Sequence, residues 1–558
     1  MISEVEAPLL DDFDVQLDSV DYKGRPSVRS KSGCWKSSAF IIGVGVAERF
    51  AYYGISSNLL SYLSGCLGQP TATAASLLNA FYGIASLLPI VGAFVADSFS
   101  GRYRMIISAS VFYILGLIFL STSASLNSFN SVSAAVVLVP NNLQQQQQLQ
   151  IVFFFFSLYL VALSQGGVTP CIQAFGADQF DENNEKEFKA KSSFFNWMYC
   201  CSVGGILVPL LVLTYIQENL GWVLGFGIPA AVMFLTLIVF LVGTPFYRFP
   251  IKNDNAKNPV MRIFRVFFQA ARNWRAETTL HQENTRFKFL EKALIVPTTK
   301  DGLCSIEDVK DATSILRLIP IWCTAMGYSI VYAQPSTLFT KQATTLDRHL
   351  FTSSYEIPAA SLQQFFISGS IMVFIPIYDR VFVPIARSIT KKPSGISMLL
   401  RIGIGLLLSL LSMVYAAIIE KKRLATAVEY GLQDMPNIII PMSAWWLAPQ
   451  YVLSGIADVF TMIGLQEFFY DQIPGDLKSI GLAMYLSILG VGSLSSSLLV
   501  SSVENVTKGR HNQRQGWFAD NLNRAHLDYF YWLLAGLSVF EFAAYVYFSR
   551  SYVNRKKD

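Results

Sequence analysis

The sequence predicts an all-α integral membrane protein, and three observations support this. Apolar residues make up 52% of the 558 residues, whereas charged residues make up only 15%. A soluble globular chain carries about a quarter charged residues, so the deficit indicates a surface that faces lipid. The chain also contains apolar runs of about 20 residues, the length that crosses a bilayer as a helix. Helix is expected there because a spanning backbone must satisfy its own hydrogen bonds.

Twelve transmembrane helices are expected from these runs. Each is rich in Leu, Ile, Val and Phe, and the runs cover residues 37–63, 74–97, 104–124, 151–175, 193–216, 222–244, 314–338, 359–386, 396–419, 443–470, 478–502 and 528–549. Lys and Arg are concentrated in the segments on the side of the two termini. The segments that connect the first six runs on the other side of the membrane contain no Lys or Arg. The positive-inside rule therefore places both termini in the cytosol.

A polar segment near 245–312 divides the runs into two sets of six. Two six-helix halves are the major facilitator architecture, in which substrate binds near the midplane between the halves. Within the divider, Val260–Trp274 alternates apolar and basic residues, which predicts an amphipathic helix at the membrane face. The predicted regions are a cytosolic N-terminal tail, an N-terminal bundle, a cytosolic linker with the amphipathic helix, a C-terminal bundle and a cytosolic C-terminal tail, at 1–36, 37–244, 245–312, 313–550 and 551–558. The run Gln144–Gln148 is interpreted as a low-complexity loop.

Ionisable residues inside the predicted spans are the candidate functional residues, because a charge at the bilayer centre costs about 2.5–3.5 kcal/mol. Glu48 and Arg49 lie in the first span and Glu467 in the tenth. Helical spacing puts Glu48, Arg49 and Tyr52 on one face with Gly45. Two interpretations stay open for the charge pair. It is either a proton-responsive switch or a self-neutralising pair that fixes helix packing.

A short turn after the second span carries another acid and base. Asp97 and Arg102 flank Gly101, and Gly favours a tight bend. Such a pair can latch neighbouring helix ends during transport and break as the helices move. The alternative is an ordinary salt bridge within a loop.

Composition excludes several other classes of function. The seven Cys residues show no metal-ligand spacing, so we expect neither a metal nor another cofactor. The net charge of +5 is spread over many loops and gives no basis for nucleic-acid binding. Nothing in the sequence predicts an enzyme. The expected partners are the lipid bilayer and a small-molecule anion, with protons left open.

Seven stretches in order along the chain form a specific pattern. They read AERFAYYGI (47–55), GAFVADSFSGRY (92–103), FGADQFDE (175–182), FFNWMY (194–199), TLDRHL (345–350), IYDRVFVP (377–384) and GLQEFFYDQIP (464–474). Together they resemble the proton-dependent oligopeptide transporter family, and especially its plant branch, the nitrate transporter/peptide transporter family. The resemblance implies the major facilitator fold and a transporter. It covers the chain except for the N-terminal tail and the middle segment.

The sequence departs from that family at three positions. The family motif E-x-x-E-R-F begins here with Gly45, so its first Glu is absent. The helix-4 motif has Thr169 where the family carries a Lys, which in relatives is thought to pair with the residue that is Glu467 here. Tyr332 stands before Ala-Gln where some nitrate-transporting members have a His.

These departures point to an anion carrier with weakened or absent proton coupling. Arg49 can bind an anion, whereas Thr169 offers no second charge for a zwitterionic peptide. Nitrate is the first expected substrate. With coupling lost, net export from the vacuole to the cytosol becomes plausible. The alternatives are a proton-coupled symporter of di- and tripeptides or of organic anions such as hormones or glucosinolates, and a non-transporting sensor.

The N-terminus favours the vacuolar membrane. It reads Glu4-Val5-Glu6-Ala7-Pro8-Leu9-Leu10, which resembles the acidic dileucine signals of some plant members. The plasma membrane is the alternative, in which case this segment is an ordinary solvated tail.

Overall fold

The structure is a computed structural model. It describes residues 15–59, 62–69, 71–136, 143–251, 259–275, 288–294, 304–349, 357–391, 395–435, 438–507, 517–518 and 521–552. The acidic dileucine segment at 4–10 lies outside the described residues. The chain forms two compact units, Met1–Pro259 and Val260–Asp558.

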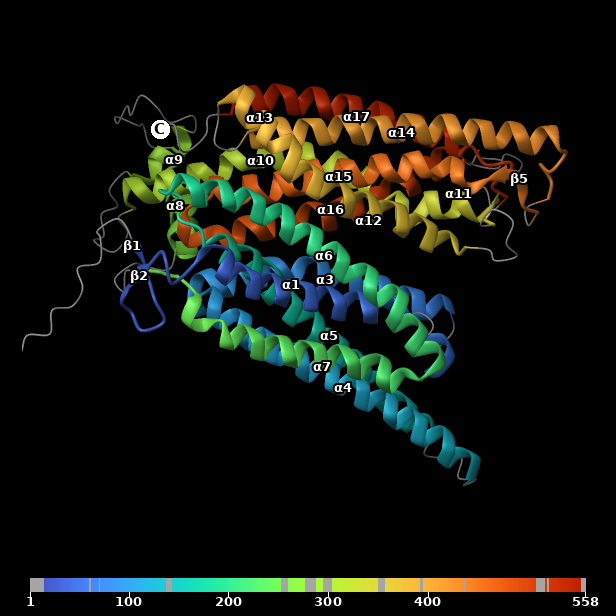
Figure 1. Cartoon of the computed structure of the whole chain (residues 1–558). Coiled ribbons are helices and arrows are strands. Elements are labelled where there is room, and N and C mark those ends of the chain that lie inside the picture. Colours follow the sequence, from blue (N-terminus) through green and yellow to red (C-terminus); the bar gives the residue numbers. More distant parts are fainter. Residues whose placement is uncertain are drawn as a thin grey trace, which may run out of the picture. The chain divides into compact units, whose positions relative to one another are not determined.

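The first unit is a bundle of six long helices (Figure 1). They are α1 (Cys34–Ser56), α3 (Thr71–Val95), α4 (Arg102–Val136), α5 (Leu143–Ala177), α6 (Glu185–Asn219) and α7 (Trp222–Val242). The π-helical turns Tyr62–Cys66 and Ala96–Ser100 follow α1 and α3. α1 packs against α5, α6 and α7. The charged face of α1 therefore lies inside the bundle.

The second unit contains another six long helices. They are α10 (Ile306–Tyr332), α12 (Ala359–Ile377), α14 (Met398–Glu429), α15 (Ala448–Gln472), α16 (Lys478–Thr507) and α17 (Leu527–Arg550). Four shorter helices are α8 (Pro259–Arg272), α9 (Lys288–Glu291), α11 (Thr340–Thr344) and α13 (Val383–Thr390). α15 packs against α12, α14 and α16. Of the candidate membrane spans, α15 is the most deeply buried, with 72% of its most apolar stretch inside the protein.

The all-α prediction is confirmed, since each of the twelve predicted spans overlaps one long helix. The predicted span 359–386 also takes in the π-helical turn Tyr378–Phe382 and part of α13. Among the described residues, 11 helices are long and apolar enough to cross a membrane. α1 completes the twelve: its 23 residues suffice to cross a bilayer, although Lys36, Glu48 and Arg49 lower its hydropathy. One local prediction was wrong. The backbone of Gln144–Gln148 is helical, because α5 begins at Leu143 and carries the run as its first turns.

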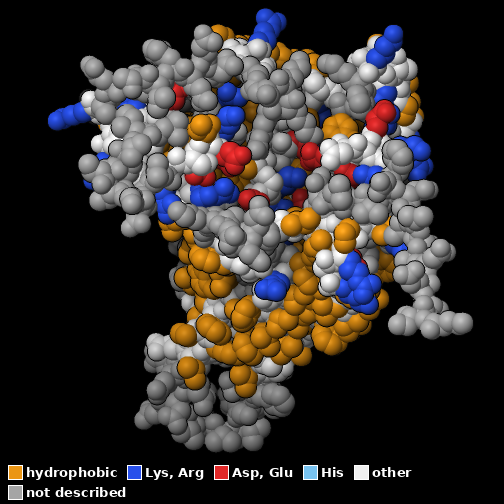
Figure 2. Space-filling view, turned by 90° about the vertical axis from the view of Figure 1, so that its left-hand side faces the viewer, with side chains coloured by type: hydrophobic (Ala, Val, Ile, Leu, Met, Phe, Trp, Pro, Cys, Tyr) orange, Lys and Arg blue, Asp and Glu red, His pale blue; other side chains and the backbone are white. Residues whose placement is uncertain are grey.

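Apolar side chains on the helix flanks identify the lipid-facing surface. Val91, Phe112, Phe156 and Phe234 each leave more than half of their surface exposed. Exposing these side chains to water would cost about 25 cal/mol of free energy per Å² of apolar surface. Figure 2 looks onto the helix ends near β1 and β2 and shows charged side chains gathered there, with hydrophobic side chains along the flanks.

Part of the predicted N-terminal tail is folded. β1 (Val15–Val20) pairs antiparallel with β2 (Pro26–Val28) and with β3 (Phe249–Pro250), which follows α7. Asp21 closes the β1–β2 turn by accepting from the Lys23 and Arg25 backbone N–H groups at 2.8 and 2.9 Å. The Arg25 N–H is the main cause that lowers the pKa of Asp21. A second, parallel pair joins β4 (Leu346–Asp347) to β5 (Ile440–Ser443).

Candidate functional site

A small polar recess in the first unit brings together residues from three predicted motifs. α1 contributes Gly45, Glu48 and Arg49, α5 contributes Thr169, Ile172 and Gln173, and α6 contributes Met198 and Ser202. Glu48 and Arg49 were predicted from one stretch of the sequence and Thr169 from another, and helix packing places all three around one recess. Gln173 and Ser202 were missed, because neither stands out among the polar residues of an apolar helix.

Glu48 and Arg49 form an ion pair at the edge of this recess. Arg49 Nε lies 3.4 Å from Glu48 Oε2, and Glu48 is only 2% exposed. Gln165 and Thr169 border the same carboxylate. Polar oxygens of Glu48, Thr169 and Gln173 therefore gather around one recess, where a polar ligand would be stabilised.

Gly45 stands where its helix meets a side chain of α6. A Cβ atom at this position would lie 2.5 Å from Met198 Cε and 3.6 Å from Ile172 Cγ2. Met198 thus occupies the space beside α1 into which the Glu of the family motif would extend. The absence of that Glu leaves the recess with one carboxylate among its lining residues.

Tyr52, the fourth predicted residue of this face, does not line the recess. It is half-buried, and its ring meets that of Tyr53 edge to face at a centroid distance of 5.5 Å. Gly45, Glu48 and Arg49 line the recess, whereas Tyr52 lies one turn beyond it.

The predicted turn between α3 and α4 contains the expected ion pair. Arg102 Nε lies 3.3 Å from Asp97 Oδ1, and Gly101 adopts a φ of 76°. Arg102 has a further partner, Asp178, just beyond the end of α5. One guanidinium therefore joins the end of α3, the start of α4 and the end of α5. Its role as a gate stays a prediction.

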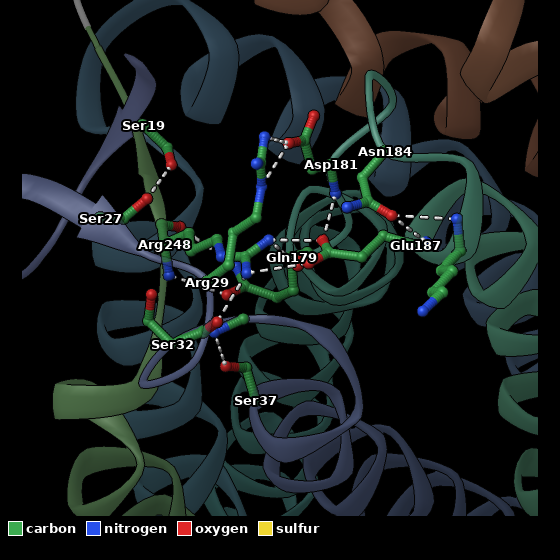
Figure 3. Close-up of polar contacts among 12 residues, drawn as sticks. Ser19, Ser27, Arg29, Ser32, Ser37, Gln179, Asp181, Asn184, Glu187 and Arg248 are labelled. Atoms are coloured by element: carbon green, nitrogen blue, oxygen red, sulfur yellow. Dashed lines mark hydrogen bonds and ion pairs between the residues drawn. The ribbon is translucent and has the colours of Figure 1, made fainter. Parts of the chain in front are cut away.

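A second arginine that joins several segments, Arg248, was not predicted from the sequence (Figure 3). Arg248, which follows α7, is 1% exposed and donates to both Glu187 carboxylate oxygens at 2.6 and 3.2 Å. It also donates to the backbone carbonyls of Gln179 at 3.2 Å and Ser32 at 2.7 Å. Arg29 forms a separate ion pair with Asp181 at 2.5 Å. The folded N-terminal segment is thus fastened to the α5–α6 connection and to the exit of α7. No sequence signal separated Arg248 from other arginines near predicted span ends.

Glu467 has a cationic partner, although the Lys that pairs with it in relatives is replaced here by Thr169. Arg401 of α14 places Nη1 3.6 Å from Glu467 Oε2, and both side chains are buried. The Arg401 guanidinium also lies over the Tyr378 ring, 4.6 Å from its centroid. The second unit therefore balances this carboxylate from within.

Tyr332, the remaining predicted residue, packs on a buried polar cluster. Its ring lies 6.2 Å from that of Tyr328 on the same helix. Tyr328 donates its hydroxyl to Asp458 of α15 and its backbone N–H to Glu541 Oε1 of α17, the latter at 2.8 Å. Asp458 and Glu541 are 7% and 8% exposed. Both acids lie within predicted membrane spans, and packing buries them.

Across the described residues, no group of three or more His, Cys, Asp or Glu side chains is arranged to hold a metal ion.

Two six-helix units with charged residues buried inside apolar bundles define a polytopic membrane transporter. Residues 103–518 match the POT family, and the chain belongs to that family. It is 54% identical over 553 residues to Protein NRT1/PTR FAMILY 5.10 of Arabidopsis thaliana, and the match covers 97% of both chains. It is 51% identical to NRT1/PTR FAMILY 5.13 of the same plant over 561 residues, again with 97% of both chains covered.

Solved structures confirm the fold. An autoinhibited POT family peptide transporter superposes with a TM-score of 0.57 at 20% identity, with 93% of this chain and 98% of that chain covered. A POT family transporter in complex with 5-aminolevulinic acid gives 0.56 at 16% identity, with 92% and 96% covered. The predicted family and major facilitator fold are therefore confirmed.

Proposed function

We propose that this transporter carries small anions, nitrate first, by alternating access, with weakened coupling to protons. The observation that supports the proposal is the composition of the recess on α1, α5 and α6. Arg49 is the basic residue and Glu48 the acidic residue among those that line it, while Gly45 and Thr169 contribute no charge.

The chemistry of the lining favours an anion over a zwitterion. A planar guanidinium presents donors in a fork that matches the oxygens of a planar oxyanion. Ser202 and Thr169 supply hydroxyl groups beside it. A peptide zwitterion needs two opposite charges set apart, whereas the acidic and the basic residue that line the recess lie side by side at 3.4 Å.

The proposal of weakened proton coupling depends on the charges that line the recess and on how the two carboxylates are paired. Glu48 and Glu467 each have an arginine partner, Arg49 and Arg401. Arginine does not give up its proton in proteins, so each carboxylate stays matched by a fixed charge. The missing Glu at position 45 and the missing Lys at position 169 are the two elements that would otherwise change charge in the recess. An uncoupled carrier in the vacuolar membrane would release stored nitrate down its gradient.

Proton-coupled symport is the second candidate, and one observation favours it. Asp458 and Glu541 are buried in the second unit and hydrogen-bond to Tyr328. Carboxyls in such positions often serve in proton relays. Peptides or organic anions would then be the substrates. A non-transporting sensor is the third reading of the same departures.

The deciding experiment measures isotopic nitrate flux into proteoliposomes at two pH values under clamped voltage. The unmodified protein should carry nitrate at similar rates at both pH values, and a protonophore should leave the rate unchanged. Arg49→Ala should abolish flux while the protein still inserts, whereas Lys189→Ala, which breaks the exposed Lys189–Glu185 pair, should keep it. Normal flux in Arg49→Ala would show that the pair only fixes packing. Absence of flux in the unmodified protein would favour the sensor.

The vacuolar site is tested separately. Replacing Leu9 and Leu10 with Ala should move a fluorescent fusion from the vacuolar membrane to the plasma membrane. If the fusion stays in the same membrane, the argument for vacuolar export fails, whereas the proposed substrate is unaffected.

A further inference from the structure

Helix α8 presents three different faces along its 14 residues. Val260, Ile263, Val266 and Ala270 are buried against the protein. Roughly opposite them lies an exposed apolar stripe, defined by Met261, Phe264 and Phe268, and a basic edge with Arg265 and Arg272 runs between the two. These positions follow the helical repeat of 3.6 residues, so each face is continuous.

The helix is held at one end of the second unit. Arg262 lies 3.5 Å from Asp308, in the first turn of α10, and 3.2 Å from Asp476, directly before α16. Both of these helices are candidate membrane spans. α8 therefore lies at the level where spanning helices leave the bilayer, and Arg262 is engaged in fastening it there.

The apolar stripe exposes large side chains. Met261, Phe264 and Phe268 are 55%, 63% and 68% exposed, and Trp274 just beyond the helix is 64% exposed. Exposing Phe and Trp to water forfeits the favourable burial that they supply elsewhere. Amphipathic helices that lie in the membrane interface carry such Phe and Trp side chains on the face that enters the bilayer.

The basic edge is not occupied by the protein. Neither Arg265 nor Arg272 makes a hydrogen bond or ion pair with another residue in the described part of the chain. Arg262, one turn from Arg265, does make such pairs. Two guanidinium groups beside an apolar stripe are complementary to a layer of lipid headgroups that carry negative charge.

We propose that α8 docks on the bilayer surface, with the apolar stripe in the headgroup region and Arg265 and Arg272 bound to anionic phospholipid headgroups. The phosphate of a headgroup accepts from guanidinium N–H groups in a bidentate fashion. The proposal is independent of which substrate is carried, because it involves none of the residues that line the recess.

The test uses the full-length protein in nanodiscs of phosphatidylcholine with and without phosphatidylserine. Native mass spectrometry would measure retained phosphatidylserine relative to phosphatidylcholine. Each of Arg265→Gln and Arg272→Gln should lower this ratio about fivefold, as expected for one basic residue near an anionic surface. The matched controls, Lys189→Gln and Lys341→Gln, each remove one positive charge elsewhere and should keep the ratio.

Hydrogen exchange of the α8 amides gives a second readout that does not depend on transport. Exchange should slow when phosphatidylserine is present, and Phe264→Ser with Phe268→Ser should abolish that protection while the exchange of α10 stays unchanged. Equal ratios in the unmodified protein and both arginine variants would overturn the proposal. Protection that appears only on addition of a soluble protein would also overturn it, because the stripe would then be a protein-binding surface.

Discussion

Arg401 on α14 lies 3.6 Å from Glu467 on α15, so the Glu467 carboxylate of this transporter has its cation within the same unit. The guanidinium also donates to the Val459 carbonyl at 3.3 Å. The resemblance to the family suggested that this Glu depends on a Lys at the position of Thr169. The local pair removes that dependence, which explains how the Thr is tolerated without a stranded charge.

Arg401→Met should destabilise the protein strongly. Removing one member of a buried pair typically costs about 3–5 kcal/mol, because the other charge stays buried and unmatched. Replacing both members, with Arg401→Met and Glu467→Leu, should cost much less. Thermal unfolding in detergent would measure this. A double variant that is at least as unstable as the single one would show that Arg401 acts through Tyr378 packing instead.

Gly327→Ala tests the polar cluster in the second unit. A Cβ at position 327 would lie 2.5 Å from Glu541 Oε2 and 2.7 Å from Glu541 Cδ. We expect Glu541 to be displaced and the Tyr328 N–H to lose this acceptor, at a cost of about 1–3 kcal/mol. Gly536→Ala on α17 is the control. It has no atom within 4 Å of the added Cβ and should be neutral or stabilising. Equal stability of the two variants would contradict this reading.

Arg248→Lys should loosen the folded N-terminal segment. Lys is a compact charge and cannot reproduce the four donations that Arg248 makes to Glu187, Gln179 and Ser32. Limited proteolysis should then cleave within residues 15–33 at least several times faster than in the unmodified protein. Lys189→Ala, which breaks an exposed pair, should leave cleavage unchanged. If both variants are cleaved as slowly as the unmodified protein, the three-stranded sheet alone holds residues 15–33 in place.

Span positions could be predicted from the sequence because lipid leaves the backbone few alternatives to helix. The shared face of Glu48 and Arg49 also followed from helical spacing. Arg401 could not be paired with Glu467 in the same way, because 66 positions separate them and only the packing of α14 on α15 brings them together. The strands in the predicted tail were missed because β2 is only 3 residues long and β3, the second partner of β1, lies more than 200 residues away in sequence. The burial of Asp458 and Glu541 could not be predicted, because it depends on the neighbouring helices.

Restoring the family's charges should restore proton coupling. Gly45→Glu alone places a second carboxylate beside Glu48, and Thr169→Lys alone adds a cation beside Arg49. Each single change leaves an unbalanced charge in the recess and should lower nitrate flux. The double variant is balanced. Met198 must move, since its Cε lies 2.5 Å from the added Cβ, but it is the end of a flexible side chain and can swing away.

Initial nitrate uptake at saturating substrate, under clamped voltage, compares the unmodified protein with the three variants between about pH 5.5 and 7.5, the range in which a buried carboxyl beside an opposite charge can titrate. The unmodified protein should change little over this range. The double variant should be stimulated by acid, and a protonophore should remove the stimulation, because uptake would then follow the proton gradient. A several-fold, protonophore-sensitive stimulation of the unmodified protein would mean that its remaining carboxyls already couple protons, and that Gly45 and Thr169 do not uncouple it.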